Sequence, residues 1–577
     1  MDVILLMVGS FVGYIIAYNT YGRFLERKIF RLGRQEKVPS REYEDGKDFV
    51  PTKKGIIFGH HYTSIAGTGP IVGPAIGIIW GWVPAVIWVF VGSIVMGAVH
   101  DFGALVISLR NQGKSISEIA SRYINPRVKY IFFLVVFIEL LIVVAIFGLV
   151  LAIIFDMFPQ SVFPVWMEIP IALMLGRAIY KRKANRANKI FSRANVTFAT
   201  VIAVSVMYLT VIAGHFFPFN MPAVLGIPAT GIWVIFLFIY AFFASITPVT
   251  TLLQPRDYIN AWQLFILMAL LVVGVFVSGV TTDLCIVAPA FNLNPPGTPS
   301  LWPFLFITIA CGAISGFHSL VSSGTSSKQI SQPQDALAIG YGAMLMEAAL
   351  AMLAIIAVAA GIGLAYRTGD GTVLTGIEAW ETHYASWTAS KGLGSKINAV
   401  VIGSANIMAS LGIPVALGKV IMGVFIASFA GTTLDSATRI QRYVVSELFA
   451  NIKLKFMTNK YASTTFVIAT AAMLAFAGGA DGKGALKLWP MFGGVNQLLA
   501  ALTLMLLTVY LRKGGGYKYL VTGIPCVFMT IMTFWGVAIN EYNFIKDADA
   551  MLAIINGAIF LLAIWLIVES LSVIVSK

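Results

Sequence analysis

Residues 59–77 read GHHYTSIAGTGPIVGPAIG, and they lie within an apolar stretch, residues 55–80, that is long enough to cross a membrane. Two adjacent histidines are followed by glycines and prolines at the depth where a membrane helix is normally most regular. An unpaired backbone N–H or C=O in hydrocarbon costs several kcal/mol, so such a break is tolerated only where it is buried in protein or lines a polar cavity. The stretch therefore predicts a broken membrane helix, the element in which transporters bind their cargo.

The composition places the chain in a membrane. Its 577 residues are 58% hydrophobic and only 11% charged, with a mean hydropathy of +0.84, which leaves too little polar surface for a soluble globule of this size. The two longest polar stretches, residues 22–54 and 367–396, are too short to form a catalytic domain with a core of its own. We therefore predict an all-α polytopic membrane protein whose function lies among its helices.

Apolar segments of membrane length recur along the chain and predict about fifteen transmembrane helices. They lie near residues 3–21, 56–79, 84–109, 129–152, 165–180, 195–216, 229–252, 258–279, 303–324, 336–366, 412–433, 461–480, 488–511, 517–539 and 550–575. The first lacks a basic start and a cleavage site, so we interpret it as a retained span rather than as a signal peptide. Residues 398–411 are a candidate for a sixteenth, re-entrant or interfacial, segment.

The basic residues predict the orientation in the membrane. An odd number of spans places the two termini on opposite sides of the membrane. If the N-terminus is outside and the C-terminus cytoplasmic, the cytoplasmic segments hold 33 of the 40 Lys and Arg residues and the external segments hold six. These cytoplasmic segments are residues 22–54, 110–129, 177–193, 254–257, 325–335, 439–460, 512–518 and 577. Membrane orientation thus accounts for the formal charge of +14, and no nucleic-acid partner is expected.

A second break is predicted in the seventh span, where residues 240–260 read YAFFASITPVTTLLQPRDYIN. Pro248 removes a backbone donor, and the neighbouring Ser and Thr hydroxyls could satisfy freed carbonyls or face a ligand. An ordinary kinked helix is the alternative. The first break lies in a span that runs outward and the second in a span that runs inward five spans later, which is the offset expected of a five-plus-five inverted repeat.

This assignment divides the chain into four parts. Residues 1–54 hold an accessory span and the first cytoplasmic loop, residues 55–216 the first half of the repeat, residues 217–448 the second half, and residues 449–577 the C-terminal accessory spans.

Ionisable residues inside membrane helices are costly, so each is a functional candidate. The candidates are His60, His61, His100, Asp101, Glu139, His318, Glu347 and Lys419. A histidine can titrate in the physiological range, which suits proton coupling, and His61 and His100 are the leading proton sites. The alternative is that several of these residues only pair with one another. No H-x-x-x-H or C-x-x-C spacing is present, so no bound metal is expected, and the three scattered cysteines are interpreted as packing residues.

The ninth span carries a dense group of hydroxyls. Those proposed for ion or proton coupling are Ser322, Ser323 and Thr325, flanked by Ser319 and Ser326. Hydroxyl and carbonyl oxygens suit a small hard cation such as sodium, or a water that relays a proton. Serine in a helix often does no more than bond the carbonyl four residues earlier, which is the simpler explanation.

The two predicted breaks supply a candidate substrate site. Its residues are Gly67, Thr68, Gly69, Pro70, Gly73, Ser245, Thr247 and Thr250. Amides exposed at the start of the half-helix after Gly67 favour a carboxylate by roughly 0.3–1 kcal/mol. This site would serve pyruvate, another monocarboxylate, an amino acid or a peptide C-terminus. Alternating access around it would move the cargo.

Several long motifs resemble the carbon starvation protein A family. They are DGKDFVPT, GHHYTSIAGTGPIVGP, GAVHDFG, ITPVTTLLQPRDYIN, CGAISGFHSLVSSGTSSK, FAGTTLDSATRIQRYVVSEL and VNQLLAALTL, in the family order between Tyr21 and Leu504. The resemblance implies a cytoplasmic-membrane transporter of the amino acid, polyamine and organocation type. Similar members are described as proton-coupled pyruvate importers or as peptide uptake systems induced by carbon starvation.

We therefore expect a secondary active transporter that imports pyruvate with a proton, and no cofactor beyond the coupling ion. Uptake of di- or tripeptides or amino acids, with a proton or sodium, is the alternative. A membrane nutrient sensor is disfavoured because no signalling domain is attached, and an enzyme because no nucleophile elbow or H-E-x-x-H motif is present. A channel is disfavoured because two opposed broken helices are the transporter pattern. The oligomeric state is open.

Overall fold

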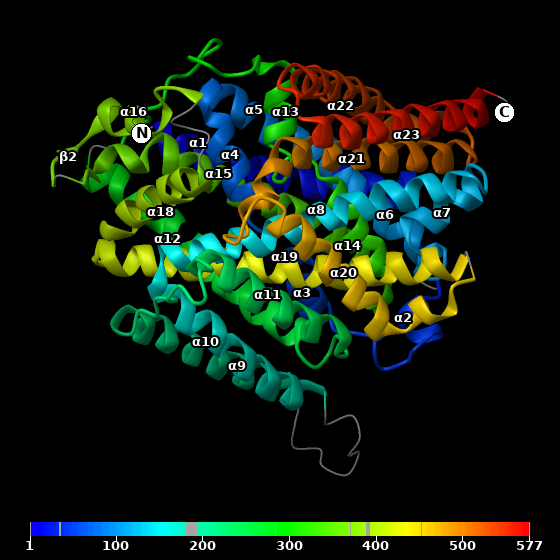
Figure 1. Cartoon of the computed structure of the whole chain (residues 1–577), viewed down its shortest axis with the longest axis horizontal. Coiled ribbons are helices and arrows are strands. Elements are labelled where there is room, and N and C mark those ends of the chain that lie inside the picture. Colours follow the sequence, from blue (N-terminus) through cyan, green and yellow to red (C-terminus); the bar gives the residue numbers. More distant parts are fainter. Residues whose placement is uncertain are drawn as a thin grey trace.

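The computed structural model describes residues 2–33, 36–180, 193–282, 284–369, 371–387, 393–451 and 453–575. These residues are mostly helical, as the composition predicts, and the long helices run in roughly the same direction across Figure 1. The N-terminus lies toward the left and the C-terminus toward the right of this bundle in Figure 1. Residues 181–192, in the predicted cytoplasmic loop 177–193, and residues 388–392, in the polar stretch 367–396, lie outside the described residues.

The α-helices of the first half of the chain are α1 (Asp2–Ala17), α2 (Pro39–Glu42), α3 (Lys54–Ala66), α4 (Gly69–Gly77), α5 (Trp82–Gly92), α6 (Ala98–Arg110), α7 (Ile116–Tyr123), α8 (Val128–Met157), α9 (Val162–Tyr180), α10 (Arg193–Phe216), α11 (Ala229–Ile246) and α12 (Leu253–Thr281). Those of the second half are α13 (Leu301–Thr308), α14 (Gly316–Gly324), α15 (Ala343–Ala359), α16 (Gly376–Tyr384), α18 (Leu393–Ala409), α19 (Val415–Asn451), α20 (Lys460–Phe476), α21 (Trp489–Arg512), α22 (Leu520–Lys546) and α23 (Ala550–Val575).

Shorter elements complete the fold. Wide π-helical turns extend or precede membrane helices at Tyr18–Gly22, Leu25–Ile29, Ser93–Gly97 and Leu337–Gly342. Single 3₁₀ turns lie at Ile78–Trp80, Pro159–Ser161, Ser326–Lys328, Gly361–Leu364, Lys455–Thr458, Lys483–Leu488 and Gly516–Tyr519. A two-stranded antiparallel hairpin, β1 (Tyr366–Arg367) and β2 (Val373–Leu374), lies in the predicted external loop.

Within the described residues, thirteen helices are long and apolar enough to cross a membrane, and all thirteen coincide with predicted spans. The other two predicted spans differ in form. Residues 461–480 form the shorter apolar helix α20, and residues 303–324 are divided between α13 and α14. The multi-span membrane fold is therefore confirmed, whereas the exact number of crossings and the five-plus-five repeat remain predictions.

The burial of the helices separates the centre of the bundle from its margin. The segments Lys54–Trp80, Leu337–Leu364 and Lys483–Arg512 are almost completely buried, whereas only 28% of the apolar window is buried in Asp2–Ile29 and in Ala550–Val573. A helix that is apolar on all sides and exposed on most of them is suited to face lipid. The first and last helices thus cover the outside of a bundle whose centre contains the predicted first break.

The predicted first break is present. α3 ends at Ala66, Gly67 adopts a φ of 45°, and α4 begins at Gly69. A positive φ is accessible to glycine at little steric cost, which explains why the residue at the break has no side chain. Pro70 in the first turn of α4 lacks an N–H, so its position costs no helical hydrogen bond.

The predicted second break lies elsewhere. α11 ends at Ile246, and residues 247–252 connect it to α12, so SITPVTT ends one helix instead of interrupting it. The interruption of a membrane segment is found at residues 309–315, between α13 and α14, where Gly312 has a φ of 88°. A proline between two long apolar runs is compatible with a kinked helix or with the end of a helix. Here the helix ends, and Arg439 of the same chain binds the Thr247 carbonyl just after that end.

Two further predicted boundaries change. Residues 254–257 are not a loop, because α12 begins at Leu253 and Arg256 is buried within the bundle. The candidate sixteenth segment is a helix, α18, whose buried residues pack against α15 and α19.

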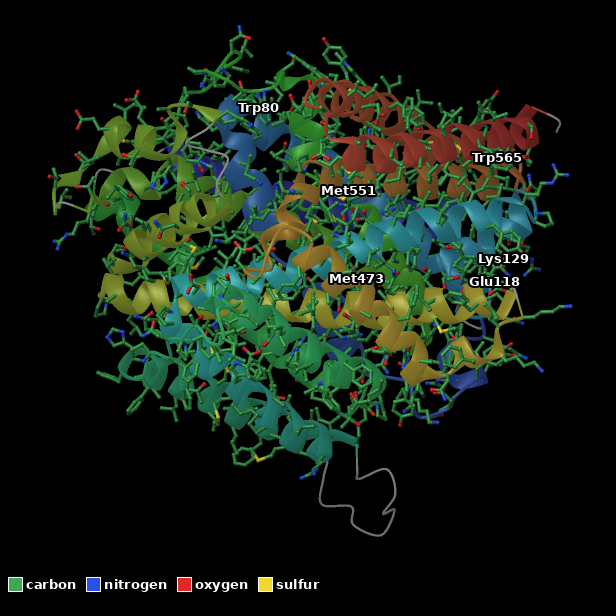
Figure 2. The ribbon with its side chains drawn as sticks, in the orientation of Figure 1. Trp80, Glu118, Lys129, Met473, Met551 and Trp565 are labelled. Carbon is green, nitrogen blue, oxygen red and sulfur yellow. The ribbon has the colours of Figure 1, made fainter. Side chains whose placement is uncertain are left out.

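The two ends of the bundle differ in their residues. Figure 2 labels Trp80 toward one end and Glu118 and Lys129 at the other. The indole N–H of Trp80 donates to the Pro299 carbonyl over 3.1 Å, which ties the end of the α4 segment to a connecting loop. The functional candidates lie between these ends.

Candidate functional site

The two broken helices meet at their breaks. A Cβ atom built on Gly69 would lie 2.4 Å from Cys311 Sγ, and one built on Gly73 would lie 2.8 Å from the Thr308 carbonyl oxygen. Both distances are far below van der Waals contact, so the backbone of α4 approaches the segment after α13 as closely as glycine permits. The glycines singled out in the sequence therefore bring two unwound segments together.

The other side of the first break faces α19. A Cβ atom on Gly67 would lie 2.5 Å from Thr433 Oγ1, and Ser64 and Ser436 share a hydrogen bond of 3.0 Å. Thr433 Oγ1 is buried and has no hydrogen-bond partner among the described residues. Hydroxyls from a helix far along the chain thus surround the unwound turn at Gly67.

A buried charge network lies beside α3, and we name it the Arg256 cluster: His60, Tyr240, Arg256, Asp257 and Asp435. The Arg256 guanidinium contacts the Asp435 carboxylate and the Tyr240 hydroxyl through Nη1, and Asp257 Oδ1 through Nη2 over 3.4 Å. His60 Nδ1 lies 2.5 Å from Asp257 Oδ2. All five side chains are largely or fully buried. The cluster joins α3, α11, α12 and α19 through groups that each need their partners to offset the loss of water.

A small cavity adjoins this cluster. Its volume is about 20 Å³, and its lining includes Tyr240, Arg256, Glu168 and Ser428 together with apolar side chains of α8 and α9. That volume holds about one water molecule. The Ser428 hydroxyl donates to the Glu168 carboxylate, and Arg256 Nε is buried with no partner in the described part of the chain. A residue with an unpaired guanidinium donor and a residue with a carboxylate therefore line the same small cavity.

Polar side chains connect His60 with the loop before α3. His60 Nε2 lies 3.4 Å from the Gln329 side-chain amide, Gln254 donates to the Gln329 amide oxygen, and Gln254 Nε2 also lies 3.1 Å from Thr52 Oγ1. Thr52 belongs to the predicted cytoplasmic loop 22–54. A chain of hydrogen bonds thus runs from the Arg256 cluster to the end of the bundle at which that loop lies.

A second buried group, which we name the Asp101 cluster, consists of His100, Asp101, Cys311, His318 and Glu347. Asp101 Oδ1 lies 2.7 Å from His100 Nδ1, and Asp101 Oδ2 lies 2.8 Å from His318 Nδ1. His318 Nε2 lies 3.4 Å from Glu347 Oε2, and the Gly312 N–H donates to Glu347 Oε1 over 3.1 Å. The cluster therefore joins α6, α14 and α15 to the unwound segment 309–315.

The remaining predicted coupling residues fall into two groups. His61 Nδ1 is within 2.7 Å of Ser326 Oγ, so this histidine is oriented by a neighbour of the predicted hydroxyl cluster. Ser323 Oγ and Thr325 Oγ1 donate to carbonyls four residues earlier in their own helix, over 2.7 and 3.2 Å. Ser322 Oγ makes only a long contact, 3.5 Å, to the Asp101 carbonyl. The bonds that Ser323 and Thr325 donate match the simpler alternative of local backbone bonding, whereas Ser322 contacts α6 and Ser323 Oγ also accepts from the Ile116 N–H over 3.3 Å.

The predicted residues of the seventh span lie in a different environment. The Thr247 carbonyl accepts a hydrogen bond from Arg439 Nη2 over 2.8 Å, and the Thr250 carbonyl packs against Gly176 of α9. Ser245 Oγ is buried without a partner among the residues described. None of these contacts involves the meeting point of α4 and the segment 309–315.

The sequence reasoning missed the other residues of the Arg256 cluster and the adjoining Glu168. Arg256 and Asp257 were assigned to a loop, and Tyr240, Glu168 and Asp435 were not singled out. The available signal was the presence of Arg and Asp within the motifs QPRDYIN and TTLDSATR, which border apolar spans. Treating every charged residue in or within one turn of a span as a candidate would have found Glu168, Arg256, Asp257 and Asp435, but not Tyr240.

Comparison with known proteins agrees with the motifs. The family model for the carbon starvation protein CstA matches residues 2–536. The peptide transporter CstA of Campylobacter jejuni is 32% identical over 96% of this chain and 83% of its own length. The pyruvate/proton symporter BtsT of Escherichia coli is 31% identical over 93% and 81%, and the peptide transporter CstA of Bacillus subtilis is 31% identical over 97% and 94%.

Among solved structures, the crystal structure of MhsT in complex with L-phenylalanine covers 90% of this chain at 12% identity. Its TM-score of 0.38 is too low to establish a shared fold. The family model and the long matches to relatives carry the assignment instead, and they confirm the resemblance seen in the motifs. The chain belongs to the carbon starvation protein CstA family.

Proposed function

We propose that this chain is a secondary active transporter of the cytoplasmic membrane that imports a small carboxylate, pyruvate first among the candidates, by proton symport with alternating access. The names of its relatives support both the transport of pyruvate and the transport of peptides. The buried Arg256 cluster is the observation that carries the proposal, because ionisable groups deep among membrane helices mark substrate and ion pathways.

Arg256 is the proposed carboxylate-binding residue. Its guanidinium is held by Asp435 and Asp257, its Nε has no hydrogen-bond partner among the described residues, and the residue lines the same cavity as Glu168. Arginine suits this role because its planar fork binds a carboxylate through two hydrogen bonds. In the alternating-access cycle, substrate would compete with Asp435 for the guanidinium, and the cavity would enlarge as the two halves of the bundle separate.

His60 and Asp257 are the proposed proton site. They contact one another, and Asp257 also contacts Arg256, so protonation of this pair changes the charge beside the carboxylate-binding residue. Because coupling between two bound species is reciprocal, a proton that favours substrate must itself bind more tightly when substrate is present. Hydrogen bonds through Gln329 and Gln254 connect this proposed proton site with Thr52 in the predicted cytoplasmic loop.

A second candidate cargo is favoured by Glu168. This carboxylate lines the same cavity as Arg256, so the two together could bind the amine and the carboxylate of an amino acid or of a short peptide. Pyruvate has no amine and would leave Glu168 with its hydrogen bond from Ser428 but without a cationic partner from the cargo. The proposed orientation, with the N-terminus outside and the C-terminus cytoplasmic, applies to either cargo.

The decisive experiment is uptake into proteoliposomes that contain the purified full-length protein. Radiolabelled pyruvate, alanine, di- and tripeptides are compared under an imposed pH gradient, an imposed sodium gradient, and neither. Proton-driven accumulation of pyruvate supports the main proposal, and accumulation of a peptide or amino acid supports the second. Binding without any accumulation would instead indicate a sensor.

Variants of Arg256 test whether this residue binds the transported carboxylate. Arg256→Lys keeps the charge but loses the planar fork, so we expect the KM for the transported carboxylate to rise by about 10- to 100-fold, the equivalent of about 1.5–3 kcal/mol for a charged hydrogen bond. Arg23→Gln is the control, since Arg23 pairs with the nearby Glu26 and lies over the Tyr18 ring, outside the Arg256 cluster. A KM that is unchanged in Arg256→Lys would exclude Arg256 as the carboxylate-binding residue.

A further inference from the structure

The Asp101 cluster contains three metal-ligand types from three parts of the chain. Cys311 lies in the unwound segment 309–315, His318 on α14 and Glu347 on α15, and one potential ligand atom of each lies within 4.8 Å of the other two. Thiolate, imidazole and carboxylate are the ligand types of zinc sites. We propose that these three side chains bind a zinc-class divalent metal ion, with a fourth position left for water or another small ligand.

The spacing of two of the atoms matches a metal site. His318 Nε2 and Glu347 Oε2 are 3.4 Å apart, yet neither makes a hydrogen bond of good geometry to any residue that the structure describes. Zinc bonds of about 2.0–2.2 Å to nitrogen and oxygen, at a tetrahedral angle, separate those two atoms by about 3.4 Å. Both side chains are fully buried. The two buried atoms are at ion-pair distance without a hydrogen bond, and a cation that both atoms bind would account for this spacing.

The neighbouring residues orient the ligands. Asp101 Oδ2 accepts a hydrogen bond from His318 Nδ1 over 2.8 Å, which leaves the lone pair of Nε2 for a metal. This is the carboxylate–histidine arrangement that supports most metal-bound histidines. His100 Nδ1 holds the other oxygen of Asp101 at 2.7 Å, and the Gly312 N–H holds Glu347 Oε1 at 3.1 Å. Asp101 is therefore held through both of its oxygens, and Glu347 through one.

The charges also favour a cation. Two carboxylates, Asp101 and Glu347, face His318, while His100 contacts the other oxygen of Asp101, so acidic groups are concentrated in a fully buried part of the cluster. An uncompensated buried carboxylate is unfavourable, and a divalent ion would neutralise the two negative charges together. Cys311 is partly exposed, which gives a metal ion a route to the cluster.

The ion would hold the second break in place. Cys311 touches Gly69 of α4, and its two co-ligands lie on α14 and α15, so a bound metal would join the unwound segment to three helices. Since metal binding to a folded site is coupled to stability, removal of the ion would loosen the meeting point of the two breaks. This proposal concerns the Asp101 cluster and does not depend on which cargo the Arg256 cluster binds.

The test uses the full-length protein purified in detergent without chelator. We expect about one zinc ion per chain by elemental mass spectrometry. After removal of the ion, Co²⁺ should produce the near-ultraviolet thiolate-to-cobalt absorption band, and Zn²⁺ should abolish it. A protein that retains no metal and gives no band at any Co²⁺ concentration would overturn the proposal.

Matched variants locate the site. Cys311→Ser should lose the cobalt band, whereas Cys526→Ser, which removes the buried thiol of α22, should keep it. Asp101→Asn should weaken Co²⁺ binding by about 10- to 100-fold, because it removes the carboxylate that orients His318. An identical cobalt band in Cys311→Ser would overturn the assignment. If that variant does not fold, the test is the thermal unfolding of the unmutated protein. Its midpoint of unfolding should rise with Zn²⁺ but not with Mg²⁺. Equal responses to the two ions would overturn the proposal.

Discussion

A methyl group added to Gly69 would lie 2.4 Å from the Sγ atom of Cys311, so the two helix breaks touch at this pair of residues. Gly69 begins α4, and Cys311 lies in the unwound segment that follows α13. Side chains need about 3.4–4 Å between heavy atoms for favourable contact. Only a residue without a side chain permits this approach, and the approach connects the first half of the chain with the second.

Gly69→Ala should therefore destabilise the protein by about 1–3 kcal/mol, the usual cost of overpacking a well-packed interior. The expected measurement is a lower midpoint of thermal unfolding in detergent, together with slower uptake of the transported substrate. Gly55→Ala is the control, because a Cβ atom at Gly55 on α3 would have no neighbour within 4 Å. Equal stability of the two variants would contradict the close approach.

Removing one partner of the buried His60–Asp257 pair should impair both proton coupling and stability. Asp257→Asn should abolish accumulation driven by a pH gradient while leaving exchange of labelled substrate measurable, and should destabilise the protein by about 3–5 kcal/mol. His60→Gln should have a similar effect on accumulation. Since the residues are in contact, the double variant should lose less than the sum of the single variants.

The control for this cycle is His215→Gln, at the end of α10 and outside the Arg256 cluster. The predictions for His61 and His100 are tested in the same assay with Gln variants. Unchanged uphill uptake in any of these variants removes that residue from the candidates for proton coupling.

Alanine variants of Ser326 and Ser323 test which ion is coupled to transport. Ser326 Oγ lies 2.7 Å from His61 Nδ1, so Ser326→Ala should shift the pH dependence of uptake. Ser323 Oγ donates to its own helix, so Ser323→Ala should cost about 0.5–1.5 kcal/mol of stability and leave ion dependence unchanged. Sodium-dependent kinetics that change in Ser323→Ala would instead restore the predicted hydroxyl-lined sodium site.

Lys396, at the start of α18 and outside the thirteen candidate spans, predicts a pH dependence of stability. Burial lowers the pKa of Lys396 to about 7, although its ammonium donates to the His383 carbonyl over 2.7 Å. Between pH 7 and the usual lysine pKa of about 10.4, the unfolded chain binds more protons than the folded chain at this position. Its contribution to the free energy of unfolding therefore rises with pH across that window.

Lys396→Met should remove this rise, so the free energy of unfolding becomes flatter between about pH 7 and pH 10. Lys487→Met, which replaces an exposed lysine, should leave the slope unchanged. The measurement is thermal or denaturant unfolding in detergent at a series of pH values. The same slope in Lys396→Met and in the unmutated protein would contradict the prediction.

Much of the membrane fold could be predicted because hydrocarbon imposes a simple rule on the chain. Every backbone polar group must be paired within its own segment, so apolar runs of membrane length become helices, and thirteen of the predicted spans are found. The break after Ala66 was predictable for the same reason, since two glycines and a proline in the middle of an apolar run leave few alternatives.

The second break was not predictable in the same way. Pro248 lies beside a charged segment, and the contacts of Thr247 with Arg439 turned a possible kink into the end of α11. Residues 309–315 contain no proline, and their unwinding depends on contacts with Gly69, Gly73 and Glu347, which are distant in sequence. Local sequence carries no signal for such contacts.

The amino-acid sequence by itself determined that this protein is a helical membrane protein of the CstA family with a break at Gly67, because hydropathy, glycine placement and motifs are local properties. Only the tertiary structure decided which charges meet. It placed Arg256 between Asp257 and Asp435, and His318 between Asp101 and Glu347, from segments that are separated by up to 217 residues in the chain. The physical reason is that a buried charge must find its partner in space, and the partner's position along the chain is set by the packing of whole helices.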